Sequence, residues 1–145
     1  MPIELPAFKV VQQLGRTYRA MLSSFDASMG LPLPRWRVLL ALYQQGQLSQ
    51  KQLAEHLGMD PAALTRQVKA MQNLGLIARH NDERDNRLTN VVLTGDGTRL
   101  VEQALPKRMQ FFGTLVSDLS ADEVETLSRL LDILEKRLRH EMPHP

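Results

Sequence analysis

The chain has 145 residues, of which 43% are hydrophobic and 23% are charged, with a formal net charge of +2 and no cysteine. These values are typical of one ordinary folded domain, and they exclude a disordered or fibrous chain, disulfide bonds and thiol-based oxidant sensing. No run reaches the roughly 20 apolar residues needed to cross a bilayer, and no export signal opens the sequence, so we expect a cytoplasmic protein. Residues 47–93 hold six basic and five acidic residues, so any contact with DNA must come from a few placed cations.

A long first helix is expected over residues 7–29, because apolar residues recur there at spacings of three and four. Gly30, Pro32 and Pro34 end it, since proline lacks an amide hydrogen and disfavours helix at the residue before it. A second helix follows and ends at Gly46, where a left-handed cap is often needed. The apolar sides that we expect to be buried comprise Phe8, Val11, Leu14, Tyr18, Met21, Leu22 and Phe25 in the first helix, and Trp36, Leu39, Leu40 and Tyr43 in the second.

A helix-turn-helix is predicted between residues 49 and 73. Ser49 stands three residues before Gln52, the spacing of a capping box in which each side chain bonds a free backbone amide of the first turn. Gly58 ends this helix, and Asp60 followed by Pro61 begins the next one with an acidic cap and a proline at the first helical position. Two short helices joined by a glycine-containing turn are typical of this motif, whose second helix faces DNA.

The second helix of the motif separates into two faces. At about 100° per residue, Leu64, Val68 and Met71 fall within roughly 60° of one another, which indicates a core face. The opposite face carries small, polar and basic side chains that could read a major groove, although any amphipathic helix also has a polar side in water. That face comprises Ala62, Thr65, Arg66, Lys69 and Asn73.

Two strands, residues 76–81 and 88–93, are predicted around a polar hexapeptide that is long enough to form the tip of a hairpin. The hexapeptide runs from Asp82 to Arg87 and interleaves acids with arginines, whereas turns ordinarily favour glycine, asparagine or proline. Opposite charges can brace one another and hold an arginine extended, and the narrow minor groove attracts such an arginine. The alternative is a surface ion-pair cluster that contributes under about 1 kcal/mol.

Several motifs follow one another at regular intervals through these segments: Leu53-Ala54 with Leu57-Gly58, Leu64-Thr65-Arg66, Gly75-Leu76-Ile77, Asp82-x-Arg84-Asp85-x-Arg87 and Leu93-Thr94-x-x-Gly97. In this order they resemble the multiple-antibiotic-resistance regulator (MarR) family of winged helix-turn-helix transcription factors. The resemblance spans essentially the whole chain and implies a mainly α fold with a small β-hairpin wing. It also implies a single domain over 1–145, with a winged helix-turn-helix core at 34–97 and helical dimerisation regions at 1–30 and 98–145.

The resemblance also implies roles for individual residues. Arg84 would enter the minor groove from the wing tip, with Asp82 orienting it and Arg87 bracing the loop or touching phosphate. The sequence departs from the family at Gln67, where an apolar residue is common, and at Lys69, where an acid is common, so both could contact phosphate here. The residues that the resemblance places against the major groove are Thr65, Arg66 and Lys69.

The last third of the sequence indicates a partner chain. Ser120 and Glu123 form a second capping-box pattern, and after it apolar residues recur in heptad-like steps of three and four. We expect this stripe to pack both within the chain, on a long helix over residues 98–119, and against a second copy. Two recognition helices on a pseudo-palindrome need a twofold axis, which a homodimer supplies. The stripe comprises Val124, Leu127, Leu130, Leu131, Ile133, Leu134 and Leu138.

Catalytic and metal-binding patterns are not evident. The four histidines show no three-ligand spacing, and the sequence has neither a phosphate-binding loop nor a nucleophile elbow. We therefore expect no enzyme, no cofactor and no bound metal, and we treat the tail with His140, Glu141 and His144 as frayed rather than as a metal site.

The expected function is that of a dimeric, sequence-specific DNA-binding regulator, most simply a repressor. In the resembling family, phenolic or other aromatic anions bind between the dimer helices and the winged core, and the same could hold here. The alternative is a winged-helix protein-interaction module whose basic face only keeps it soluble. The candidate residues for the ligand pocket are Tyr18, Met21, Trp36 and Arg37, together with Phe25, Phe111 and Phe112. Such a stripe of methionine and aromatic residues is more often plain core.

Overall fold

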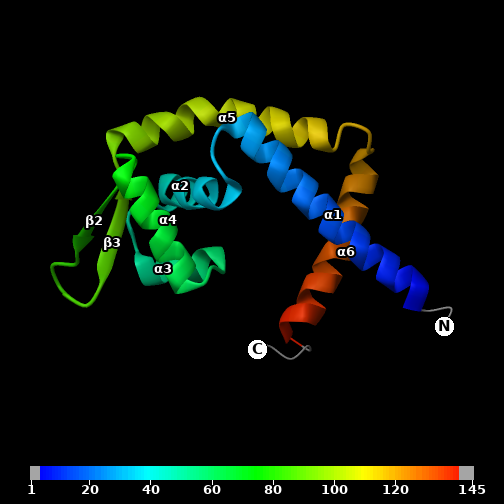
Figure 1. The fold of residues 1–145 in the computed structure, drawn as a ribbon, viewed down its shortest axis with the longest axis horizontal. Helices are drawn as coiled ribbons and strands as arrows, with labels where there is room; N and C mark the ends of the chain where they lie inside the picture. The colour runs from blue at the N-terminus through cyan, green and yellow to red at the C-terminus, as the bar shows by residue number, and fades with distance from the viewer. Residues whose placement is uncertain (1–3, 141–145) are drawn as a thin grey trace. The chain divides into compact units, whose positions relative to one another are not determined.

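The computed structural model of the chain describes residues 4–140. It is mainly helical with one small antiparallel sheet, which confirms the predicted fold class (Figure 1). The chain divides within its fifth helix into two compact units, one over residues 1–108 and the other over residues 109–145. In chain order the elements are α1 (Glu4–Met29), α2 (Leu33–Gln45), β1 (Leu48–Ser49), α3 (Gln50–Leu57), α4 (Pro61–Asn73), β2 (Ile77–Asn81), β3 (Thr89–Leu93), α5 (Gly95–Leu115) and α6 (Ala121–His140).

The helix-turn-helix forms where the capping signals predicted it. The Ser49 Oγ accepts a hydrogen bond from the Gln52 amide at 3.0 Å, and the Gln52 Oε1 accepts one from the Ser49 amide at 3.0 Å. Gly58 ends α3 with a φ of 61°, a left-handed conformation that glycine adopts without strain. The Asp60 carboxylate then accepts a 3.0 Å bond from the Ala63 amide and begins α4.

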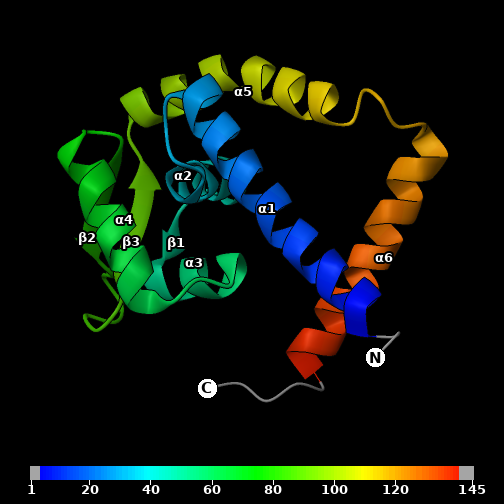
Figure 2. The same ribbon diagram turned by 45° about the vertical axis from the view of Figure 1, so that its right-hand side comes forward.

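The sheet has three strands in the order β1-β3-β2, so β3 is the central strand. The hairpin of β2 and β3 pairs Ile77 with Leu93 and Asn81 with Thr89 at its two ends, close to the predicted strand limits. The third strand, β1, was not predicted; it is only two residues long, and it pairs with β3 just before α3 begins (Figure 2). Two residues are too few for an alternating pattern, so the sequence carries no signal for this strand.

The core lies where α2, α3 and α4 pack on the sheet. The predicted inner face of α4 is confirmed, because Leu64, Val68 and Met71 are all buried. In α2 the predicted face is partly wrong, since Tyr43 is exposed and Leu40 is half-buried. Val38, Ala41 and Leu42 are buried instead, so the covered face of α2 is turned from the predicted stripe and is wider than it. The largest buried side chains are Trp36, Phe25, Leu39, Leu53, Leu64, Met71 and Ile77.

The predicted burial of the α1 stripe is wrong for most of its length. Phe25, near the end that joins α2, is fully buried, and Met21 and Leu22 are half-buried. Towards the start of the helix the stripe is open to solvent, and Phe8 is 60% exposed. Helical periodicity shows that a helix has an apolar side but does not show what covers it. The other exposed members of the stripe are Val11, Leu14 and Tyr18.

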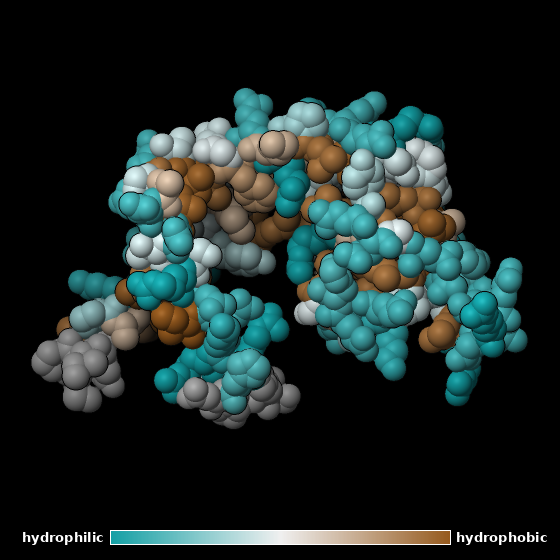
Figure 3. Space-filling view, turned by 180° about the vertical axis from the view of Figure 1, so that it is seen from behind, coloured by the Kyte–Doolittle hydropathy of each residue, from teal (hydrophilic) through white to brown (hydrophobic). Residues whose placement is uncertain are grey.

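The C-terminal helices also leave apolar surface open. The α6 helix begins with the predicted capping box, in which the Ser120 Oγ accepts from the Glu123 amide and the Glu123 carboxylate accepts from the Ser120 amide. No described residue of α6 is buried, so the leucine stripe expected to pack within the chain is exposed instead. Apolar side chains reach the surface over the long helices (Figure 3). Within residues 4–140 no helix is long and apolar enough to span a membrane.

Candidate nucleic-acid interface

The outer face of α4 presents the side chains that the sequence assigned to the major groove. Ala62, Arg66, Lys69 and Asn73 are exposed, on the side of the helix away from its buried residues. The helix is held from within by its apolar face and at its start by the Asp60 cap. These four side chains are therefore carried on a helix that is anchored at its start and along its inner face, and they are open to solvent.

Two further predicted residues of α4 are half-buried and already bonded. The Thr65 hydroxyl donates to the Pro61 carbonyl at 3.0 Å and accepts from the Gln50 amide group at 3.3 Å. The Gln67 Oε1 accepts a 3.3 Å bond from the Nε of Arg35 in α2. These bonds orient the two side chains on the surface of α4. Neither Arg35 nor Gln50 was identified from the sequence, because each lies on another helix, at a separation that no local pattern reports.

At the wing tip, Asp82 organises the backbone of the loop between β2 and β3. One carboxylate oxygen accepts hydrogen bonds from the amides of Arg84 at 2.8 Å and Asp85 at 3.0 Å. The other oxygen accepts a 2.9 Å bond from the side-chain amide of Asn90. The Asn90 bond and then these two amides hold the pKa of Asp82 below its ordinary value, since each stabilises the ionised carboxylate.

Arg87 and Asp85 form a second contact inside the loop. The Arg87 guanidinium donates to both oxygens of Asp85 at 3.0 and 3.2 Å, and the Arg87 amide donates to the same carboxylate at 3.1 Å. The Arg87 side chain lowers the pKa of Asp85, and yet it remains 90% exposed. Arg87 thus stabilises the loop through Asp85, and the side of its guanidinium that does not bond Asp85 still faces solvent.

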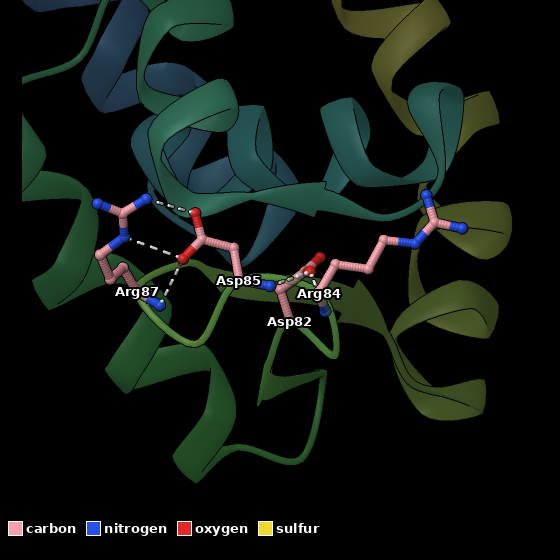
Figure 4. Close-up of polar contacts among 4 residues, drawn as sticks. All are labelled: Asp82, Arg84, Asp85 and Arg87. Carbon is pink, nitrogen blue, oxygen red and sulfur yellow. Dashed lines mark hydrogen bonds and ion pairs between the residues drawn. The ribbon is translucent and has the colours of Figure 1, made fainter.

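Arg84 is placed differently from its neighbours. Its guanidinium extends away from the Arg87–Asp85 pair, on the other side of the loop (Figure 4). Within residues 4–140 no hydrogen bond or ion pair is found for this guanidinium, and the side chain is exposed. Asp82 therefore bonds the backbone of Arg84 and not its side chain. The loop fixes the point from which the arginine projects and leaves its cationic end open.

The motif Leu93-Thr94-x-x-Gly97 joins the base of the wing to α5. The Thr94 hydroxyl donates to the Gly75 carbonyl at 2.6 Å and accepts from the Gly97 amide at 3.1 Å, while the Thr94 amide donates to the Leu76 carbonyl at 3.0 Å. Thr94 therefore caps α5 and anchors the start of the hairpin with one side chain. Two motifs that are distant in sequence, Gly75-Leu76 and Thr94-x-x-Gly97, meet at this point.

The predicted ligand-pocket residues occupy different environments. Trp36 is buried, and its Nε1 has no hydrogen-bond partner among the described residues. Arg37 is exposed and donates a 2.7 Å bond to the Leu57 carbonyl near the end of α3. Tyr18 is exposed and Met21 is half-buried on α1. Arg37 thus has a structural contact that the sequence did not indicate, and these four residues line neither the hollow beside α3 nor the one on α6.

A separate hollow of about 510 Å³ lies between α3 and the start of α4. Its lining is largely apolar, with Ala54, Met59, Pro61 and Leu64 among the residues on its walls. The described residues contain no group of three histidine, aspartate or glutamate side chains arranged to hold a metal ion. His144 and Glu141 lie outside the described residues.

Comparison with known proteins supplies the family. Residues 31–89 match the family model described as the MarR family. The organic hydroperoxide resistance transcriptional regulator of Bacillus subtilis is 30% identical over 125 residues, covering 86% of this chain and 81% of that protein.

Solved structures share the fold along nearly the whole chain. A probable transcriptional regulator from Pseudomonas aeruginosa is 28% identical with a TM-score of 0.81, over 86% of this chain and 96% of that one. The structure of BpsR from Bordetella bronchiseptica is 26% identical with a TM-score of 0.79, over 88% of this chain and 98% of that one. That structure concerns the regulation of BpsR DNA binding by 6-hydroxynicotinic acid.

Proposed function

This chain belongs to the MarR family of transcriptional regulators, and from that premise we propose that it binds a pseudo-palindromic operator as a homodimer and represses transcription. The observation that carries the proposal is the wing. A loop whose backbone is fixed by Asp82 projects one exposed, unpaired arginine, Arg84, and α4 adds an open basic face. A minor groove of enhanced negative potential accommodates such an arginine, while the adjacent major groove admits a helix.

Within this proposal, Arg66, Lys69 and Asn73 contact the major groove because they are exposed on the outer face of α4. Ala62 leaves room for close approach, since its side chain is a single methyl group. Thr65 and Gln67 are held by Gln50 and Arg35, so they reach the duplex in a preset orientation. The residues assigned to phosphate contacts are Gln67, Lys69 and Arg87.

The exposed apolar sides of α1 and α6 support the homodimer. Leu127, Leu131, Leu134 and Leu138 are each at least 40% exposed, and together they form one long stripe. A soluble protein rarely leaves a contiguous apolar stripe of this length in water unless another surface covers it. A second copy covers it under twofold symmetry and brings two recognition helices to the same face of the DNA.

Release by a small aromatic or phenolic ligand completes the proposal. BpsR is a relative whose DNA binding is regulated by a small aromatic acid, which supports the same class of effector here. Tyr18, Met21, Trp36 and Arg37 remain the candidate contacts. The B. subtilis relative is named for organic hydroperoxide resistance, but this sequence has no cysteine, so thiol oxidation cannot be its signal.

The decisive experiment is DNA selection followed by titration. Fragments of genomic DNA that bind the wild-type chain are isolated, and their affinity for Arg84→Ala is measured by gel shift over a range of salt concentrations. We expect binding to weaken at least several-fold. The negative slope of log affinity against log salt should also become shallower, because one cationic contact is lost. Lys107→Ala, which removes one exposed charge from α5, is the matched control and should bind normally.

Three results would contradict the proposal. Failure to select any fragment would instead favour a protein-interaction module. Equal loss of affinity in Arg84→Ala and Lys107→Ala would show that net charge matters and the wing does not. A monomeric mass by light scattering at micromolar concentration would exclude the dimer.

A further inference from the structure

Asn90 is a polar side chain in the middle of the sheet, and only 7% of it is exposed. It lies on the central strand β3, where it pairs with Ser49 on one side and with His80 on the other, and it precedes the fully buried Val91. A buried amide costs free energy unless it is hydrogen-bonded. Its Nδ2 meets this requirement by donating to the Oδ2 of Asp82 at 2.9 Å.

This hydrogen bond connects the central strand β3 to the loop at the tip of the hairpin. The other oxygen of Asp82 accepts from the amides of Arg84 and Asp85, at 2.8 and 3.0 Å. Without Asn90, only one carboxylate oxygen of Asp82 would be held, and the carboxylate could rotate about its bond to Cβ. With Asn90 bonded, both oxygens are fixed, and so is the backbone segment from which the Arg84 side chain projects.

We propose that Asn90 is a positioning residue for DNA binding, which orients the Asp82 carboxylate and through it the wing backbone that carries Arg84. The proposal rests on the proposed function and assigns a role to a residue that touches no DNA. A merely structural Asn90 would affect stability alone. If Asn90 is a positioning residue, its removal weakens DNA binding through Arg84. It also raises the pH at which DNA affinity is lost on acidification.

The pH at which DNA affinity is lost on acidification depends on the groups that surround Asp82. The Asn90 side chain favours the ionised form of Asp82 most strongly, followed by the backbone amides of Arg84 and Asp85 and by the charge of Arg84. The Asp85 carboxylate interacts with Asp82 within the loop, and His80, which pairs with Asn90, precedes Asp82 by two residues. Removal of the Asn90 amide therefore raises the pKa of Asp82. Protonated Asp82 accepts the two backbone bonds less well, so a variant that lacks the amide loses affinity at a higher pH than the wild type does.

The test uses the full-length chain and a DNA fragment selected with the wild type. Asn90→Leu keeps a similar branched shape without the hydrogen-bond donor, and Asn90→Ser shortens the side chain; both should bind DNA roughly fivefold to tenfold more weakly at neutral pH. Thr89→Val, a change of the neighbouring polar residue on the same strand, is the matched control and should bind within about twofold of the wild type.

A double-mutant cycle separates positioning from stability. In the Arg84→Ala background, Asn90→Leu should cost less than about a further twofold, because the arginine through which it acts is gone. The loss of affinity on acidification should begin at a higher pH in Asn90→Leu than in the wild type. Thermal unfolding followed by circular dichroism checks that each variant is folded at the assay temperature.

The failures are distinguishable. If the wild type selects no DNA, the proposed function fails and the role of Asn90 fails with it. If the wild type binds but the folded Asn90 variants bind equally well with an unchanged pH profile, only the role of Asn90 is overturned. The same conclusion follows if Asn90→Leu weakens binding equally in the presence and absence of Arg84.

Discussion

Gly97 is a position where α5 lies close against the base of the wing, and Gly97→Ala tests how tightly the two are joined. A methyl group there would lie 2.0 Å from the Leu76 carbonyl oxygen and 3.1 Å from a methyl carbon of Leu93. A carbon–oxygen contact needs about 3.3 Å, so the two backbones would have to separate by more than about 1 Å. Such a movement breaks the hydrogen bonds from Thr94 to Leu76 and Gly75.

The magnitude follows from these contacts. Loss of two hydrogen bonds costs about 2 kcal/mol, and overpacking a tight contact costs about 1–3 kcal/mol more. The better helix propensity of alanine returns about 0.5–1 kcal/mol. We therefore expect Gly97→Ala to lower the free energy of unfolding by about 2–4 kcal/mol.

Urea denaturation at a fixed protein concentration measures this change, and the midpoint should fall by roughly 1–2 M. Gly113→Ala is the matched control, because it lies in the same helix and a methyl group there meets nothing within 4 Å. That variant should be unchanged or up to about 1 kcal/mol more stable. Equal midpoints for the two variants would refute the close approach of α5 to the wing.

Three other outcomes are expected. Ser49→Ala removes the cap of α3 and should lower the free energy of unfolding by about 1 kcal/mol in the same urea assay; an unchanged midpoint would contradict the capping box. Because the pKa of Asp82 lies below its ordinary value of 3.8, the loop bonds are complete above that pH and are lost as pH falls through the lowered value. The amide resonances of Arg84 and Asp85 should shift together in that acid range, and movement above it would count against this account. Leu134→Glu should convert the proposed dimer to a monomer in light scattering, and a mass that stays dimeric would place the interface elsewhere.

Local signals in the sequence were sufficient for most of the fold. The capping residues, Gly58 and the paired strands act over a few positions, so their spacing alone predicts helix ends and a hairpin. Burial was predicted less well. Phe25 and Phe8 belong to the same stripe of α1, and Phe25 is covered whereas Phe8 is not, because coverage depends on which surface the helix meets.

For the candidate site, the sequence predicted the exposed cations and missed the residues that hold the neighbouring polar side chains in place. Arg66 and Arg84 are recognisable because one lies on the polar side of an amphipathic helix and the other at a charged turn. Gln50, Arg35 and Asn90 act through contacts across 15, 32 and 8 residues, respectively. Such pairings exist only after the helices and strands have packed, and no periodicity records them.

Ser49 belongs to two elements at once, as the last residue of β1 and as the cap of α3. Its backbone pairs with β3 opposite Asn90, while its hydroxyl closes the first turn of the helix-turn-helix. Ser49 therefore joins the wing to the helix-turn-helix through both its backbone and its side chain. In the proposed dimer, a ligand that leaves each winged helix folded would therefore act by changing the distance between the two recognition helices, and not by separating the wing from the helix-turn-helix.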